Sequence, residues 1–363
     1  MRIQLKSKVP WFLQDILANR KFFYPFSKRV GYIGWLGKNN LGDEAMYFAF
    51  CKLFENLKVF PFKYTDKIRL YEKYMRQKAY RAVFLGGGTL INYKRSYLES
   101  LKLAQQFFEQ TFVFGSGVNS PEFWSKIQGS VDNLKEWVDC LSRCKFVGVR
   151  GPLSKKILDQ AGLYNAKVIG DPALYLADKK IEQKKKIKRI GINLGISYGR
   201  VWGNEEEILN YIVRFAKVIS NDGWNITLFP VWKEDLEYVE EAARRIGNSV
   251  LICYEYKSVE RSMDFLRSCD VFMGEKLHSV ILSMCAYTPS IMLEYRPKCL
   301  DFMMSMDLEE FNVRTDSLSI DLLVHLLDKL YTNLEFYQKK IEQKVNYYKN
   351  IQSEKRTMIS KLI

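Results

Sequence analysis

The stretch VGYIGWLGKNNLGDEAMYFAFCKLFENL, residues 30–57, decides the fold class. Its short apolar start at residues 30–35 predicts a β-strand, and glycines lie at its end and directly after it. From Asp43 to Leu57 the apolar residues recur at helical spacing, which predicts an amphipathic helix. A strand that enters a helix through a glycine-rich turn is the building unit of a parallel α/β sheet.

The same alternation continues along the chain. Further strands are expected at residues 82–85, 111–114, 145–149, 166–169, 190–194, 225–231, 250–254, 271–273 and 290–293. Further helices are expected at 98–110, 153–161, 205–220, 236–246, 259–267 and 278–286, and the C-terminal stretch is also helical in pattern. The sequence therefore predicts an α/β protein.

A polar break, ADKKIEQKKKIKR at residues 177–189, separates two series of these units. It carries no apolar periodicity, so it predicts an interdomain linker, with a solvated loop inside one domain as the alternative. We expect a Rossmann-like domain at 1–178, a linker at 179–189, a second Rossmann-like domain at 190–330 and a helical segment at 331–363 that crosses back to the first domain. Since the glycine clusters follow strands, the carboxyl edges of the two sheets are expected to face each other across a cleft.

Composition narrows the classes of function. The chain has 363 residues and a net charge of +15, so it is expected to attract anions such as nucleic acid, anionic lipid or phosphorylated metabolites. It carries no zinc-ligand spacing, helix-turn-helix signature or RNA-binding aromatic motif, which argues against nucleic acid. The seven scattered cysteines and two histidines suggest reduced thiols in a cytoplasmic protein and no metal site.

The N-terminal residues do not resemble a signal peptide, and no apolar run is long enough to span a membrane. The first thirty residues mix Trp11, Phe12 and Ile16 with several cations. This pattern is typical either of an interfacial helix on an anionic leaflet or of a helix packed on its own domain.

In the first half, polar and glycine motifs follow the strands. Asn40 and Asp43 can each cap the following helix or face a ligand. Gly86, Gly87 and Gly88 form a second turn that is expected to lead through a loop into a helix, and they let a ligand approach the backbone closely. Arg150, at a strand end, can clamp a carboxylate or phosphate, or it can be salt-bridged within the fold, where Asp171 would support it.

The second half carries the most informative motif, Gly-Glu-Lys-Leu-His-Ser at residues 274–279. His278 stands at a strand-to-helix junction beside Lys276, and a histidine there can either transfer protons or simply begin the helix. The other histidine, His325, lies in an apolar helical pattern and is expected to be structural. Tyr295, Arg296 and Lys298 follow the next strand and add polar groups to the same edge.

In this order the motifs resemble the polysaccharide pyruvyl transferase family. The matching segments are Asn-Leu-Gly-Asp at 40–43, Gly-Gly-Gly at 86–88, Val-Arg-Gly-Pro-Leu-Ser at 149–154, Gly-Asp-Pro-Ala at 170–173, and Lys276, His278, Pro289, Tyr295 and Lys298. The chain departs from the family pattern at Gly151, where an acid is common, and at Lys276, where arginine is common.

The resemblance implies a GT-B-like pair of Rossmann-type domains, with the acceptor expected on the first domain and the donor on the second. It implies phosphoenolpyruvate as co-substrate, no other cofactor, and a sugar acceptor whose two hydroxyls become a pyruvate ketal. His278 and Arg150 are the expected catalytic residues, with His278 in proton transfer and Arg150 and Lys276 neutralising the donor. The expected substrate-binding residues are Lys276, Leu277, Gly86, Gly87, Gly88, Asn40, Asp43, Tyr295 and Lys298.

Two other functions remain open from sequence. One is a GT-B glycosyltransferase with a nucleotide-sugar donor, and the other is a non-catalytic scaffold that keeps the fold. The basic N-terminus would suit a lipid-linked acceptor at the inner face of the cell membrane, with the enzyme peripheral to an anionic surface.

Overall fold

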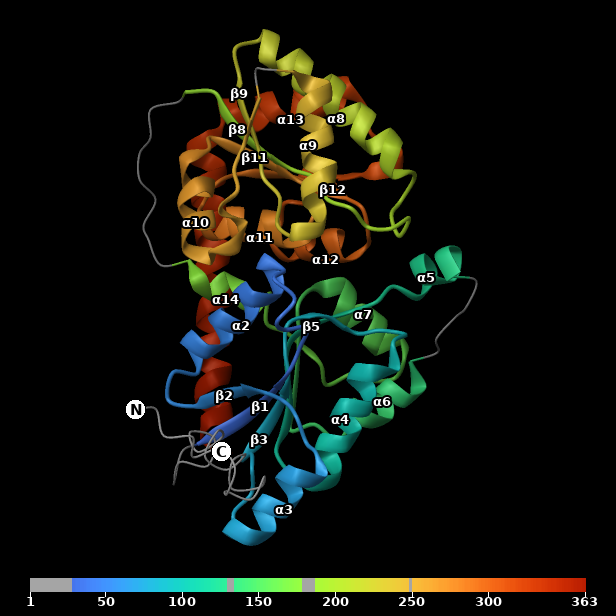
Figure 1. The fold of residues 1–363 in the computed structure, drawn as a ribbon, viewed down its shortest axis with the longest axis vertical. Coiled ribbons are helices and arrows are strands. Elements are labelled where there is room, and N and C mark those ends of the chain that lie inside the picture. The colour runs from blue at the N-terminus through green and yellow to red at the C-terminus, as the bar shows by residue number, and fades with distance from the viewer. Residues whose placement is uncertain (1–27, 129–133, 178–186, 248–249) are drawn as a thin grey trace, which may run out of the picture.

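Two parallel β-sheets form the framework of the computed structural model (Figure 1), which describes residues 28–128, 134–177, 187–247 and 250–363. The first sheet has the strand order β2-β1-β3-β5-β6-β7, with β4 beside β5, and the second has the order β10-β9-β8-β11-β12-β13. Helices cover both faces of each sheet, and residues of both domains line a cavity between them. The predicted α/β fold with two Rossmann-like domains facing across a cleft is therefore confirmed. The amphipathic N-terminal segment and most of the expected linker lie outside the described residues.

The elements of the first domain are short strands followed by helices. Its strands are β1 (Arg29–Ile33), β2 (Lys58–Pro61), β3 (Ala82–Leu85), β4 (Gly88–Ile91), β5 (Thr111–Val118), β6 (Phe146–Val149) and β7 (Lys167–Val168). Its helices are α2 (Leu41–Leu53), α3 (Asp66–Met75), α4 (Arg95–Phe107), α5 (Pro121–Gln128), α6 (Lys135–Leu141) and α7 (Pro152–Gln160), with the 3-10 turn η1 (Pro172–Leu176).

The second domain repeats the pattern. Its strands are β8 (Arg189–Asn193), β9 (Asn225–Leu228), β10 (Val250–Ile252), β11 (Val271–Gly274), β12 (Ser290–Glu294) and β13 (Asn312–Arg314). Its helices are α8 (Glu205–Asn221), α9 (Leu236–Ile246), α10 (Val259–Ser268), α11 (Leu277–Cys285), α12 (Lys298–Ser305), α13 (Ile320–Thr332) and α14 (Leu334–Ser360), with 3-10 turns η2 (Lys233–Asp235), η3 (Glu255–Lys257), η4 (Glu309–Phe311) and η5 (Thr315–Ser317).

Helix α14 crosses from the second domain to the first, as expected (Figure 1). The side chain of Gln352 donates to the carbonyl oxygens of Ile169 and Asp171, at 3.1 and 2.9 Å, just after strand β7. Farther along, Ile359 is fully buried against the core of the first sheet. The last helix therefore fastens the two domains together on the side away from the cleft.

On the cleft side the domains also touch directly. The amide of Leu41, at the start of α2, donates to the carbonyl oxygen of Val231 at 3.0 Å. The indoles of Trp35 and Trp232 meet edge to face at 5.5 Å, and Phe123 meets Trp202 at 4.7 Å. These contacts fix the separation of the two sheet edges.

One expectation from sequence is wrong in detail. The turn at residues 86–88 was expected to lead through a loop into a helix, but Gly88–Ile91 forms strand β4, which pairs with β5 at Ser116 and Val118. Gly88 has a left-handed φ of +101°, so the chain turns there and returns to the sheet before α4 begins. Among the described residues no helix combines the length and apolar character needed to cross a membrane.

Candidate active site

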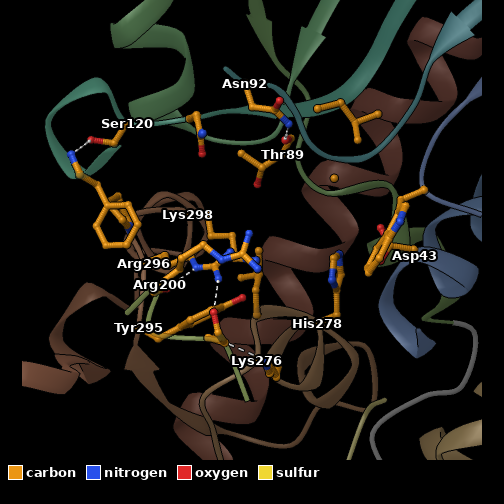
Figure 2. A pocket seen from close by; sticks show the side chains of 18 of the residues that line it. Asp43, Thr89, Asn92, Ser120, Arg200, Lys276, His278, Tyr295, Arg296 and Lys298 are labelled. Atoms are coloured by element: carbon orange, nitrogen blue, oxygen red, sulfur yellow. Dashed lines mark hydrogen bonds between the residues drawn. The ribbon is translucent and has the colours of Figure 1, made fainter. Parts of the chain in front are cut away.

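A cavity of about 370 Å³ lies between the carboxyl ends of the two sheets. Loops after strands of both domains line it, as expected for ligand sites in parallel α/β folds. Its lining includes Arg150, Lys276 and His278 together, so the three residues singled out from sequence reach one space. In the view of Figure 2, His278 lies between Asp43 on one side and the group of Arg200, Arg296 and Lys298 on the other.

Asp43 is placed by the start of helix α2. The side chain of Asn40 caps this helix by accepting from the amides of Gly42 and Asp43, at 3.1 and 3.3 Å. Burial raises the pKa of Asp43 to about 7, while the nearby charge of Lys298 opposes that rise. Asp43 therefore exchanges its proton near neutral pH, which suits acid–base chemistry.

His278 comes from the other domain, at the second residue of helix α11. Its Nε2 lies 3.2 Å from the Met46 sulfur and 3.8 Å from the Asp171 carboxylate. Burial, followed by the charges of Arg150 and Lys298, lowers the pKa of His278 well below its usual value. The imidazole is therefore neutral in the unliganded protein.

Gly42 permits this approach of the two domains. A Cβ built on Gly42 would lie 2.3 Å from Cγ and Nδ1 of His278, closer than real side chains come. Glycine in the Asn-Leu-Gly-Asp motif is therefore a requirement of packing across the cleft, and it brings helix α2 directly against the imidazole.

Arg150 lies fully buried at the floor of the cavity. Its Nη1 is 3.7 Å from the carboxylate of Asp171, and its Nη2 donates to the hydroxyl of Thr89 at 3.2 Å. Asp301 of the second domain is 4.0 Å from its Nε. The expected support by Asp171 is therefore present, and the Nε and Nη1 groups still have no hydrogen-bond partner among the described residues.

Lys276 lines the cavity, but its ammonium is held by the loop after strand β8. It donates to the carbonyl oxygen of Ile196 and to the hydroxyl of Ser197 at 3.1 Å, and it lies 3.8 Å from the buried carboxylate of Asp235. Lys276 therefore contributes charge to the cavity while fixing this loop.

Lys298 stands at the first turn of helix α12, with its ammonium 4.8 Å from the ring centroid of Tyr295. Burial, and then the charge of Arg296, lowers the pKa of Lys298 to about 7. Neither α11 nor α12 has a side-chain cap at its N-terminus. Their free amides add positive potential at the cavity edge, where an anion is stabilised.

Most of the residues expected from sequence line the cavity. They are Asn40, Asp43, Gly88, Arg150, Lys276, Leu277, His278, Tyr295 and Lys298. Gly86 and Gly87 lie behind it, where added Cβ atoms would meet Tyr32 and Met46. Sequence reasoning missed Arg200, Trp124 and Asp301, because nothing in their local sequence distinguishes them from surface or core residues.

Comparison with known proteins identifies the family. The model for the family described as polysaccharide pyruvyl transferase matches residues 40–297, which is most of the chain. No protein with a curated description matches the sequence.

Solved structures share the fold at low identity. The S. aureus MnaA–UDP structure aligns with a TM-score of 0.55 at 10% identity, over 87% of this chain and 91% of that one. A UDP-glucosyltransferase from Polygonum tinctorium aligns with a TM-score of 0.53 at 11% identity, over 92% and 99%. A structure described as a putative UDP-N-acetylglucosamine 2-epimerase from Listeria monocytogenes aligns with a TM-score of 0.54 at 12% identity, over 89% of this chain and 94% of that one. These likenesses establish the two-domain fold, and the family match establishes more: the chain belongs to the polysaccharide pyruvyl transferase family.

Proposed function

We propose that this protein transfers the pyruvyl group of phosphoenolpyruvate to two hydroxyls of a sugar in a cell-surface polysaccharide precursor, forming a cyclic ketal. The observation that carries the proposal is one cavity in which Arg150 and Lys298 stand beside Asp43 and His278. The family match supports the reaction class. The proposed location is the cytoplasm, with the acceptor carried on a lipid at the inner face of the membrane.

The charges of the cavity suit a small anion with a carboxylate and a phosphate. Lysine and arginine residues line it together with two helix N-termini, whereas Asp43 is its single carboxylate among the described lining residues. Arg150 is one of the lining residues, and its Nε and Nη1 groups lie near Asp301 and Asp171 without a hydrogen bond among the described residues. A guanidinium can bind a carboxylate or phosphate through two parallel hydrogen bonds.

The reaction needs one proton delivered and two removed. Protonation of the methylene carbon makes C2 electrophilic, and the first acceptor hydroxyl adds to C2 as it loses its proton. The C2–O bond to phosphate then breaks, and phosphate leaves with the bonding electrons. The second hydroxyl adds to C2 and loses its proton, which closes the ketal and returns the balance of protons to phosphate and solvent.

We assign the delivered proton to His278 and the first removal to Asp43. The imidazole is neutral without ligand because burial and the charges of Arg150 and Lys298 lower its pKa. A bound trianion offsets those charges, so donor binding raises the pKa of His278 and allows it to carry the proton. Asp43, with a pKa of about 7, is ionised often enough at neutral pH to accept a proton.

Binding of phosphoenolpyruvate tests the donor. We expect it to raise the midpoint of thermal unfolding of the wild type, and UDP-glucose to leave it unchanged, because binding to the native state alone stabilises it. Lys298→Met should abolish the shift, whereas Lys217→Met, an exposed change on α8, should keep it. A shift with UDP-glucose and none with phosphoenolpyruvate would favour the glycosyltransferase alternative.

The pH dependence of kcat/KM tests the two groups that titrate near neutrality. We expect kcat/KM to show a narrow peak near pH 7. On the acid side kcat/KM rises as Asp43, with a pKa of about 7, loses the proton that would block it as a base. On the alkaline side kcat/KM falls as Lys298, also with a pKa of about 7, loses its charge. Asp43→Asn should remove the rise on the acid side. Lys298→Arg should remove the part of the alkaline fall that Lys298 causes, because arginine stays charged, and leave the part due to deprotonation of His278. Phosphate release, followed from about pH 5 to about pH 9, measures both limbs. An acid limb that survives in Asp43→Asn would exclude Asp43 as the base.

A further inference from the structure

The cavity has more cations than the donor requires, and they differ in their pairing. Arg150 faces Asp171 and Asp301, and Lys276 faces Asp235. Arg200 and Arg296 also line the cavity, yet neither lies within salt-bridge distance of a carboxylate in the described part of the chain. Two unmatched guanidiniums in one cavity favour binding of an anion there.

Arg296 is fixed in place without losing its charge. Its Nε donates to the carbonyl oxygen of Arg200 at 2.6 Å, and its Nη2 reaches the carbonyl oxygen of Ser197 at 3.5 Å. The guanidinium lies 4.9 Å from the ring of Tyr295 and 6.0 Å from that of Trp124. Stacking on aromatic rings orients a guanidinium and leaves edge N–H groups for an anion.

Side-chain carboxylates hold the loop that carries Arg200 through several hydrogen bonds. Buried or partly buried carboxylates accept from its amides: Glu275 from Gly195, Asp235 from Ile196, and Glu205 from Ser197 and Gly199. Tyr198 takes a left-handed φ of +54° within this network. Such ordering lowers the entropy cost of binding, which is typical of a binding loop rather than a loose surface turn.

Aromatic side chains line the same part of the cavity. Tyr93 meets Trp124 at 4.4 Å, and both residues contribute to the cavity wall. Ligand pockets of this type combine aromatic walls with a few polar groups that set orientation. The wall provides an apolar surface for a sugar ring next to the two arginines.

We propose that Arg200 and Arg296 form a second anion subsite, which binds an acidic group of the acceptor sugar, either a phosphate or a carboxylate. The proposal rests on the proposed function, because it takes the Arg150 and Lys298 region as the donor site. It makes the acceptor an anionic saccharide. Arg200 and Arg296 keep their charges whether or not the donor is bound. The second subsite can therefore be tested separately from the donor site.

Titration of inorganic pyrophosphate and of glucuronate into protein saturated with phosphoenolpyruvate tests the subsite. We expect at least one of the two anions to bind, and Arg200→Gln to raise its Kd about 10- to 100-fold, the effect of losing a charged hydrogen bond. Arg200 is the cleaner variant because the loop contacts use its backbone amide and carbonyl and not its side chain. Arg214→Gln, exposed on α8, is the matched control and should bind like wild type.

The outcomes separate the two proposals. The second subsite is excluded if neither anion binds the saturated wild type, or if Arg200→Gln weakens phosphoenolpyruvate as strongly as the anions, which would place Arg200 on the donor. If phosphoenolpyruvate itself fails to bind, the proposed function is wrong. Pyrophosphate binding that Arg200→Gln weakens in the protein alone would then still support an anion subsite. Tighter binding of pyrophosphate would indicate that the subsite takes a phosphate, and tighter binding of glucuronate would indicate a carboxylate.

Discussion

Replacement of His278 by glutamine is expected to lower kcat for pyruvyl transfer by about 10²–10⁴-fold, the range for loss of a general acid or base. Glutamine has a similar size and keeps polar contacts, but it cannot exchange a proton. The affinity for phosphoenolpyruvate should stay close to that of wild type, because the imidazole is neutral without ligand and adds no charge to binding. Phosphate release gives kcat, and the thermal shift gives donor affinity.

The chain offers a matched control for this variant. His325 is exposed on helix α13, outside the cavity, so His325→Gln should keep wild-type turnover. Loss of donor affinity together with turnover in His278→Gln would show that the residue binds rather than transfers a proton. Turnover near the wild-type rate would exclude both roles.

The fold and much of the site could be predicted from local sequence, because the relevant signals are local. A strand that ends in glycine before a helix places its next residues at the carboxyl edge of a parallel sheet. That rule alone put Asn40, Asp43, Arg150 and His278 at the two facing edges. The structure adds that they reach one cavity.

The remaining features depend on contacts between distant segments. Asp301 interacts with residues almost 150 positions earlier in the chain, and Arg200 is held by Arg296 through its backbone. The pKa of His278 also could not be predicted, since burial and cations from other segments determine it. An isolated histidine at a helix start suggests a group that titrates near neutrality, whereas the folded site makes it neutral until an anion arrives.

Asp301 is expected to contribute strongly to the stability of the fold, through contacts that join the two domains. Its carboxylate accepts from the amides of Leu153 and Ser154 at 2.8 and 3.1 Å and from the Ser154 hydroxyl at 2.6 Å. It therefore caps helix α7 of the first domain from helix α12 of the second. The cap of α7 in its own sequence is Gly151, which has no side chain to offer.

Asp301→Ala should lower the free energy of unfolding by about 3–5 kcal/mol, the cost of removing one partner of a buried charge, here beside Arg150. Loss of the helix cap accounts for about 0.5–2 kcal/mol of this. Asp301→Asn keeps an acceptor oxygen without the charge, so its effect should be intermediate. Urea denaturation measures the change. Asp66→Ala is the control: its side chain is 97% exposed and forms a surface ion pair with Arg69 in the first turn of α3, so the change should cost no more than about 1 kcal/mol.

Gly151 and Asp301 should act as one unit, because they compete for the same space. A Cβ on Gly151 would lie 2.3 Å from the Asp301 carboxylate and 2.4 Å from its backbone oxygen, so Gly151→Ala must displace α12 at a cost of about 1–3 kcal/mol. In the double variant of Gly151→Ala and Asp301→Ala, the carboxylate that the new Cβ would meet is absent, and the cap of α7 is already lost. The combined loss should therefore be smaller than the sum of the single losses by about 0.5–3 kcal/mol, as expected for residues in contact. Strictly additive losses would mean that Gly151 and Asp301 act independently. In this chain the carboxylate that caps α7 comes from Asp301 of the second domain, since Gly151 has no side chain to cap the helix.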